Sequence, residues 1–409
     1  MKVERPPLLL LVHRIPYPPN KGDKVRSYRI LRHLAERYRV FLATFVDHPD
    51  DWVHLPTVEG WCEGVCARPL LPRASRLASL RGLLTGEALT LPYYRDRTLA
   101  HWVNRVVRQH DIRHAVVFSG SMAQYLEGLP LTRRVVDFCD VDSEKWRQYA
   151  PTKPWPLNWL YAREGRRLLD FEADAALASD VSLFATCPEG ALFQRRAPRA
   201  ATRVAVMENG VDTTFFSPAA AGATPFLPGG PVLVFTGAMD YWPNVDAVCW
   251  FAHDILPRLR HTVPGVQLWI VGMNPSAEVR ALVREGEVVV TGTVPDVRPY
   301  LGHADAVVAP MRIARGIQNK VLEAMAMGRP VVAHPACLQG LAARVGEDIL
   351  AASGPDEFVA ALLEALGPQG RAIGAAARAR VAEGYDWAQQ LTVLDRALGS
   401  GVGLGEVSL

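Results

Sequence analysis

The chain has 409 residues, 49% of them hydrophobic, so its length suggests two to three domains that can each bury a core. Charged residues make up 21% and the formal net charge is +3, which excludes nucleic-acid binding by bulk attraction. The sequence has no apolar run of about 18 residues and no signal-like N-terminal stretch, so we expect a cytoplasmic protein. The six cysteines are scattered, which favours reduced thiols over a zinc site.

The first half of the chain alternates strand and helix patterns. A short apolar strand is expected over residues 8–12, a helix over 25–38 and a second strand over 40–46. Residues 52–98 contain prolines and glycines and show no clear period. The remaining expected elements are a helix over 157–178 and strands over 115–119, 134–138, 181–185 and 204–207. This β–α–β order predicts a parallel sheet with crossover helices.

A change of composition separates this series from a second one. Residues 217–231 hold four prolines and three glycines, which is typical of a linker, although a surface loop within one domain has the same composition. The second series has helices expected over 245–259, 277–284, 297–301 and 317–327, and strands over 232–236, 266–271, 288–291, 306–309 and 330–333. Two such series predict an α/β protein with two doubly wound, Rossmann-like domains facing a cleft. The expected parts are 1–212, a linker at 213–230, 231–385, and a segment at 386–409 that returns to the first domain.

The loop and helix after the fourth strand of the second series collect charged residues where an open parallel sheet binds its ligand. Gly316, Lys320 and Glu323 are spaced to share one face of a helix. A glycine lets a ligand approach the backbone, a helix N-terminus attracts phosphate, and a carboxylate further along can accept hydrogen bonds from a ribose. An ordinary surface ion pair between Lys320 and Glu323 is the alternative. The preceding Arg312 and Arg315 favour a nucleotide-diphosphate site.

Motifs throughout the chain resemble a known family. The stretches are Asn209-Gly210-Val211-Asp212 with Phe216 and Pro218, Phe235-Thr236-Gly237, PGVQLWIVG at 264–272, VTGTV at 290–294 and LEAMAMGRPVVA at 322–333. In combination they resemble the retaining glycosyltransferases of family four, which have the two-domain fold called GT-B. The stretches DVDSEKW at 140–146, MDYWPN at 239–244 and GIQNK at 316–320 are similar to a bacterial exopolysaccharide sugar-transferase subgroup associated with PEP-CTERM/exosortase systems.

The resemblance implies a nucleotide-diphosphate sugar as co-substrate, no cofactor, and a specific set of site residues. Donor-binding residues are expected at Gly22, Gly237, Thr293, Val294, Arg312, Gly316, Asn319 and Glu323. Catalytic residues are expected at Asp140, Arg315 and Lys320, and acceptor-side residues at Lys21, Asp142 and Trp146. No metal ligand is expected.

The sequence departs from the family pattern at three positions. Of two glutamates that flank seven residues, the second matches Glu323, but the first falls on Arg315. The Arg and Lys that grip the diphosphate are replaced by Ala238 and Pro243. Because binding a diphosphate without cations is costly, we infer that the cationic grip has moved to Arg312, Arg315 and Lys320.

The N-terminal domain is expected to bind the acceptor, a polysaccharide or a polyprenyl-linked oligosaccharide. Asp140 and Asp142 form an Asp-x-Asp pair after an expected strand, and we interpret the pair as an acceptor contact and a helix cap; a divalent-ion site is the alternative. A leucine-rich stretch contains Arg68, Arg73, Arg76 and Arg81 and can lie on the inner face of the inner membrane. Packing of its leucines on the domain core is the alternative.

Two other functions fit a two-domain nucleotide-sugar fold. One is a nucleotide-sugar epimerase, which needs acid and base residues at the strand ends, where the second series has few. The other is a non-catalytic nucleotide-sugar sensor, which the missing first glutamate favours. Release of free nucleotide diphosphate in the presence of an acceptor distinguishes a transferase from both.

Overall fold

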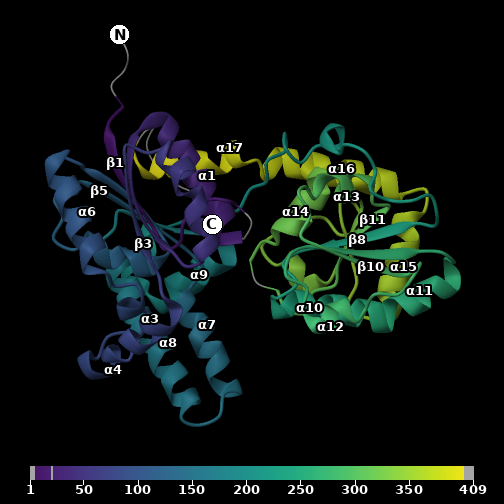
Figure 1. Cartoon of the computed structure of the whole chain (residues 1–409), viewed down its shortest axis with the longest axis horizontal. Helices are drawn as coiled ribbons and strands as arrows, with labels where there is room; N and C mark the ends of the chain where they lie inside the picture. Colours follow the sequence, from purple (N-terminus) through teal and green to yellow (C-terminus); the bar gives the residue numbers. More distant parts are fainter. Residues whose placement is uncertain (1–4, 20–21, 315, 400–409) are drawn as a thin grey trace. The chain divides into compact units, whose positions relative to one another are not determined.

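The computed structural model describes residues 5–19, 22–314 and 316–399 (Figure 1). The chain forms two compact units, one of Met1–Met207 with Leu391–Leu409 and the other of Glu208–Gln390. We call them the first and the second domain. Each contains one parallel sheet with helices packed against it, so the expected α/β class with two Rossmann-like domains is confirmed.

The sheet of the first domain has seven strands in the order β3-β2-β1-β4-β5-β6-β7, and every pair is parallel. Its strands are β1 (Pro7–Val12), β2 (Arg39–Val46), β3 (Gly64–Pro69), β4 (His114–Phe118), β5 (Arg133–Cys139), β6 (Val181–Phe184) and β7 (Val204–Val206). The central strand β1 is almost wholly apolar because both faces of a parallel sheet are covered.

The helices of the first domain include several that the sequence did not reveal. They are α1 (Gly22–Arg37), α2 (Leu55–Glu59), α3 (Pro72–Ser79), α4 (Arg81–Thr85), α5 (Thr90–Tyr93), α6 (Arg97–Gln109), α7 (Asp142–Tyr149), α8 (Leu157–Leu177) and α9 (Cys187–Arg196). The stretch 52–98 therefore holds an edge strand and short helices rather than irregular chain. Its helices have at most eight residues, too few to show a helical period, and β3 is only half-buried. Helices α7 and α8 form an antiparallel hairpin that projects from the sheet (Figure 1).

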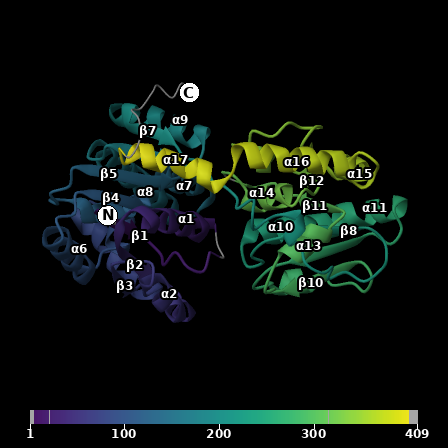
Figure 2. The ribbon, with the colours of Figure 1, turned by 90° about the horizontal axis from the view of Figure 1, so that it is seen from above.

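The last described helix returns to the first domain. Figure 2 shows α17 (Trp387–Ala397) beside α1. His33 of α1 lies 2.8 Å from a carboxylate oxygen of Asp395, and Arg133 of β5 donates to the Ala397 carbonyl at 2.5 Å. Leu394 is fully buried. The second half of α17 is thus part of the first domain's core.

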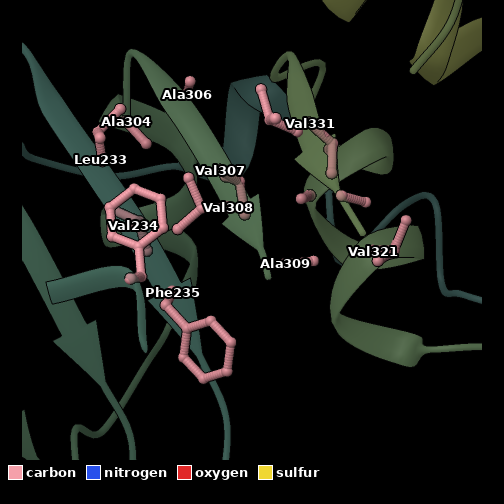
Figure 3. Packing of buried hydrophobic residues seen from close by; sticks show 14 of the residues in the cluster. Leu233, Val234, Phe235, Ala304, Ala306, Val307, Val308, Ala309, Val321 and Val331 are labelled. Carbon is pink, nitrogen blue, oxygen red and sulfur yellow. The ribbon is translucent and has the colours of Figure 1, made fainter. Parts of the chain in front are cut away.

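The sheet of the second domain has the order β10-β9-β8-β11-β12-β13, again all parallel. Its strands are β8 (Val232–Thr236), β9 (Gln267–Val271), β10 (Val288–Gly292), β11 (Ala306–Ala309), β12 (Val331–Ala333) and β13 (Leu350–Ala351). Figure 3 shows Phe235 of β8 and Val307 of β11 in the buried core that joins the two central strands. Burial of these apolar side chains is the main stabilising contribution here.

Helices cover both faces of this sheet, with α10 and α12 on one and α13, α14 and α16 on the other (Figure 1). Their bounds are α10 (Trp242–Trp250), α11 (Leu256–Thr262), α12 (Ala277–Arg280), α13 (Arg298–His303), α14 (Asn319–Ala326), α15 (Pro355–Leu366) and α16 (Gly370–Gly384). A π-helical turn, Phe251–Ile255, joins α10 to α11. At the start of α13 the N-cap residue is Val297, and the preceding Asp296 accepts a hydrogen bond from the Arg298 amide at 2.9 Å.

Residues 213–230, which were expected to be a linker, lie in the second unit. Ala221 is buried, and a Cβ added at Gly302 of α13 would lie 2.3 Å from its side chain. His303 contacts the Gly222 carbonyl at 2.9 Å. In the described part of the chain, every helix is too short or too polar to span a bilayer.

Candidate nucleotide-sugar site

The strand order of the second domain fixes where a ligand can bind. The connections from β8 to β9 and into β11 lie on opposite sides of β8, which makes a switch point at its carboxyl end. A glycine directly follows β8 and β9, at Gly237 and Gly272, and β10 ends at Gly292. A Cβ on Gly272 would lie 1.7 Å from the Gly237 carbonyl oxygen, so these strand ends are packed backbone against backbone. The floor of the switch point is therefore main chain.

Lys320 of α14 reaches this floor. Its Nζ donates to Asn244 Oδ1 at 2.6 Å and lies 4.2 Å from the centre of the Phe235 ring. The Asn244 amide is oriented because its Nδ2 donates to the Ala238 carbonyl at 2.8 Å. A Cβ at Gly237 would come within 2.9 Å of Nζ. Gly237 and Lys320, both predicted site residues, are thus in direct contact.

The ammonium group of Lys320 has no acidic partner within ion-pair distance among the described residues. Burial lowers the pKa of Lys320 to about 7, because an amide and an aromatic face replace only part of its hydration. Lys320 is also the only lysine between residues 208 and 390. A half-buried cation without a counter-ion at a switch point is suited to an anionic ligand.

Glu323 lies three residues further along α14, as the spacing predicts. Burial raises the pKa of its carboxyl to about 7, and Lys320 opposes part of that rise. The Glu323 carboxyl group has no hydrogen-bond partner in the part of the chain that the structure describes. The oxygens Asn319 Oδ1 and Thr236 Oγ1, at the start of α14 and the end of β8, are also buried without a partner there. These unmatched polar atoms favour a polar ligand or water at this place.

The helix α14 begins later than the sequence suggests, which changes the place of Gly316. The helix starts at Asn319, with Gln318 as its N-cap residue, so the expected shared helical face of Gly316 with Lys320 and Glu323 is wrong. Gly316 lies in the preceding loop with φ of +61°, a left-handed conformation that favours glycine. Arg315, a predicted catalytic residue, lies outside the described residues.

The other predicted donor contacts lie further from Lys320. The Arg312 guanidinium group donates two hydrogen bonds to the Asp246 carboxylate, at 2.6 and 3.2 Å. The same group lies 4.9 Å from the centre of the Trp250 ring. Thr293 and Val294 follow β10, two strands away from β8. Among the predicted cations that the structure describes, Lys320 is therefore the one that is half-buried and has no acidic partner.

In the first domain, the Asp-x-Asp pair binds a lysine. Lys145 Nζ lies 2.9 Å from a carboxylate oxygen of both Asp140 and Asp142. The expected helix cap is wrong: α7 has Val141 at its N-cap without a side-chain cap, and the Val141 amide instead donates to Glu189 at 2.9 Å. Asp142 lies in the first turn, where its charge still favours the helix dipole.

Trp146, a predicted acceptor residue, packs inside the α7–α8 hairpin. Its ring makes an edge contact with Tyr161 at 4.8 Å between centroids. Gly22 is the exposed first residue of α1, and Lys21 lies outside the described residues.

The switch point of the first domain, between β1 and β4, carries a cluster that the sequence analysis did not single out. His13 Nε2 lies 3.4 Å from an Asp23 oxygen that also accepts from Arg14 at 2.7 Å. Arg14 bridges to Asp47 at 2.8 Å. These partners hold the pKa of the Asp23 carboxyl well below its usual range against the opposing effect of burial. The position of His13 directly after a buried strand was the available signal.

One ring nitrogen of His13 has no hydrogen-bond partner among the described residues. The ring stacks on Phe118 at 5.6 Å between centroids, and its buried Nδ1 is the nitrogen without a partner there. In the described part of the chain, no group of three His, Cys, Asp or Glu side chains is placed to hold a metal ion.

Comparisons with known proteins agree with this geometry. Residues 230–367 match the family described as "Glycosyl transferases group 1". Sucrose-phosphate synthase from Thermosynechococcus elongatus is 18% identical, with 97% of this chain and 100% of that chain covered and a TM-score of 0.70. Anabaena HepE in complex with UDP-glucose is 14% identical, with 96% and 100% covered and a TM-score of 0.64. WaaG, a glycosyltransferase involved in lipopolysaccharide biosynthesis, is 18% identical, with 96% and 100% covered and a TM-score of 0.66.

No curated protein sequence matches the chain significantly. The match to the glycosyl transferases group 1 family thus lies within the second domain, and the chain shares the two-domain fold of GT-B glycosyltransferases.

Proposed function

We propose that the protein is a retaining glycosyltransferase that moves a hexosyl group from a nucleotide-diphosphate sugar to a polysaccharide or polyprenyl-linked acceptor in exopolysaccharide biosynthesis. The observation that carries the proposal is the half-buried Lys320 ammonium group, which lies at the β8–β11 switch point without an acidic partner among the described residues. Such a group is matched by the diphosphate of the donor. The HepE complex with UDP-glucose shows that this fold accommodates such a ligand.

Each donor part has a proposed contact. The diphosphate binds Lys320 and the N-terminus of α14, helped by Arg315 and Arg312, while Asn319 and Gly316 line its path. The ribose hydroxyls donate to Glu323. Gly237, Gly22, Thr293 and Val294 are the proposed backbone and edge contacts to the donor.

The proposed reaction is a front-face displacement. The acceptor hydroxyl oxygen forms a bond to the anomeric carbon as the bond from that carbon to the diphosphate oxygen breaks on the same face. The leaving diphosphate takes the hydroxyl proton, so charge and atoms balance without a metal ion or cofactor. Protonated Lys320 stabilises the negative charge that develops on the leaving group.

The first domain is the proposed acceptor domain, with Asp140, Asp142, Lys21 and Trp146 on the acceptor side. We propose that it works at the inner face of the inner membrane through the basic, leucine-rich stretch that contains Arg73, Arg76 and Arg81. An Asp140→Asn variant is expected to lower kcat with an acceptor present more than it weakens donor binding. Equal loss of both, or activity that requires a divalent ion, would contradict this role.

A thermal-shift screen with UDP, GDP and ADP tests the donor site first, because a ligand at 100 times its Kd stabilises by about 2.7 kcal/mol. Lys320→Ala is expected to lose affinity for the nucleoside diphosphate far more than for the nucleoside. Equal losses would show that the charge acts elsewhere. Nucleotide binding without acceptor-dependent release of nucleotide diphosphate would favour a sensor, and an altered sugar on the unchanged nucleotide would favour an epimerase.

A further inference from the structure

The outer end of the α7–α8 hairpin exposes large aromatic side chains. The exposed fractions are 81% for Trp155, 54% for Trp159, 49% for Tyr149 and 44% for Leu157. All four lie at or next to the connection between the two helices. Exposed apolar residues scattered singly are common, but a group of this size at one projecting end marks an interaction site.

A second exposed apolar group lies against the same hairpin, on α3 and α4. Leucines there are exposed by 40 to 90%: Leu77, Leu80, Leu83 and Leu84. The two groups are joined by Arg163 of α8, which donates to the Gly82 carbonyl at 2.7 Å and to the Glu87 carbonyl at 3.2 Å. Trp159 lies one helical turn before Arg163, on the same side of α8. We call the exposed residues of α3, α4 and the hairpin end the hairpin surface.

The two segments that form this surface contain no acidic residue. Residues 64–86 and 145–163 hold four basic residues each and neither Asp nor Glu. In the second segment, Lys145 and Arg147 form ion pairs with Asp140, Asp142 and Glu144, which precede it in the sequence. Arg73, Arg76 and Arg81 are exposed between the leucines, and half-buried Lys153 lies between the hairpin aromatics. The charge of the surface is therefore complementary to an anionic partner.

The hairpin presents these residues on a stiff support. A Cβ at Gly165 of α8 would lie 2.6 Å from Arg147 Cγ and 3.0 Å from the Ser143 carbonyl of α7, so the helices touch closely. At the base, the buried Glu172 carboxylate accepts from the Ser143 amide at 3.1 Å and from its hydroxyl at 2.5 Å. The exposed tryptophans therefore lie on, or in the connection between, two closely packed helices.

The mixture of residues identifies the partner. Trp and Tyr are favoured at the boundary between lipid headgroups and acyl chains, leucines enter the acyl boundary, and Arg and Lys contact anionic headgroups. A second copy of the chain fits poorly, because a two-fold contact would bring two acid-free basic faces together.

We propose that the hairpin surface docks on an anionic lipid bilayer, with Trp155 and Trp159 inserted at the interface beside the leucines of α3 and α4. The proposal rests on the proposed membrane partner of the transferase and extends it from one stretch to a composite surface. It places the first domain on the bilayer through two elements far apart in the sequence.

Co-sedimentation of the full chain with phosphatidylglycerol–phosphatidylcholine vesicles tests the proposal at low salt, with pure phosphatidylcholine vesicles for comparison. Trp155→Ala/Trp159→Ala is expected to weaken binding on the order of tenfold through lost apolar burial. Arg76→Glu/Arg81→Glu is expected to weaken it by about 30-fold or more, since each basic residue near an anionic surface contributes about fivefold. The matched controls are Leu227→Ala, at a position 85% exposed in the second domain, and Arg105→Glu/Arg108→Glu, an equal charge change on α6.

Wild-type binding to anionic vesicles that both hairpin-surface variants lose and both controls keep supports the proposal. Absence of vesicle binding, equal losses in test and control variants, or a concentration-dependent dimer abolished by the tryptophan replacements overturns it. The assay contains neither donor nor acceptor, so its result is independent of the transferase assay. Nucleotide release with a soluble acceptor separately decides the proposed function.

Discussion

Lys320 is a half-buried base whose protonation controls what it can bind. Because a diphosphate stabilises the protonated amine, the pKa of Lys320 must be higher in the complex than its value of about 7 in the free protein. Affinity for a nucleotide-diphosphate sugar is therefore expected to fall as pH rises above about 7, by at most tenfold per pH unit. A Lys320→Arg variant, which stays charged, is expected to lose this slope. A pH-independent wild-type affinity between 7 and 9, measured calorimetrically with UDP-, GDP- or ADP-glucose, would contradict it.

The same pKa can be measured without a ligand. The second domain has no other lysine, so acylation at Lys320 is identified by mass spectrometry in a single peptide. A lysine with a pKa near 7 reacts at neutral pH, where ordinary lysines are protonated. Nucleotide-diphosphate sugar is expected to protect the amine.

The Glu323 carboxylate is the proposed acceptor for the ribose hydroxyls. Glu323→Gln keeps the shape but removes the charge, and hydrogen bonds to charged groups contribute about 1.5–3 kcal/mol, so nucleotide affinity is expected to fall by about 10- to 100-fold. Glu285→Gln, at an exposed position in the same domain, is the control. Thermal unfolding without ligand checks that both variants fold. An unchanged nucleotide Kd for Glu323→Gln would exclude the ribose contact.

At the scale of elements, α16 determines where α14 sits. Arg378 of α16 donates to the Ala326 carbonyl at the end of α14 and to the Phe216 carbonyl. A Cβ at Gly374 would lie 2.3 Å from the Gly328 carbonyl oxygen, directly after α14. The close approach of the two segments needs a residue without a side chain.

Two glycines of α16 give a matched comparison. Gly374→Ala is expected to destabilise the protein by about 1–3 kcal/mol, because the contacted atom is backbone and must be displaced. Gly384→Ala has open space and is expected to be neutral or stabilising by up to about 1 kcal/mol. Chemical denaturation of the full chain measures both. Equal stabilities of the two variants would show that α14 and α16 can separate without cost.

The elements also show how far the sequence predicts this fold. Buried parallel strands such as Leu8–Val12 stand out because their apolar residues are continuous, and the βα alternation then gives the class. The short helices α3–α5 were not predicted. Several of their leucines, such as Leu84, are exposed, so the hydrophobic residues do not follow the spacing of an amphipathic helix. Lys320 and Glu323 could be proposed as site residues together because they are close in the sequence. Asn244 contacts Lys320 across 76 residues, so only the fold reveals that pair.

At the scale of the whole molecule, the chain passes through the second domain and returns to the first with α17. Leu394 of α17 is fully buried there although the residues before α17 belong to the second domain. Leu394→Ala is expected to cost about 2–5 kcal/mol of first-domain stability. Leu363→Ala, at a position 38% exposed in α15, is expected to change stability by at most about 0.5 kcal/mol.

Hydrogen exchange of the full chain measures this loss of stability separately for each domain. In Leu394→Ala, peptides from residues 22–207 are expected to exchange faster while peptides from 208–390 stay unchanged. Faster exchange confined to the second domain would contradict the assignment of the chain end to the first core.

The close packing of Gly237 and Gly272 after β8 and β9 has a consequence for engineering the specificity of the proposed donor site. Because a side chain at Gly272 would overlap the Gly237 carbonyl, a mutant library at these positions yields misfolded proteins and not new specificities. Whatever rests on this floor of the switch point meets main-chain atoms that mutation leaves unchanged. Selection for a different sugar can therefore act only on side chains around it, such as Asn244 and Glu323. A small library directed there samples the variation that this architecture leaves open.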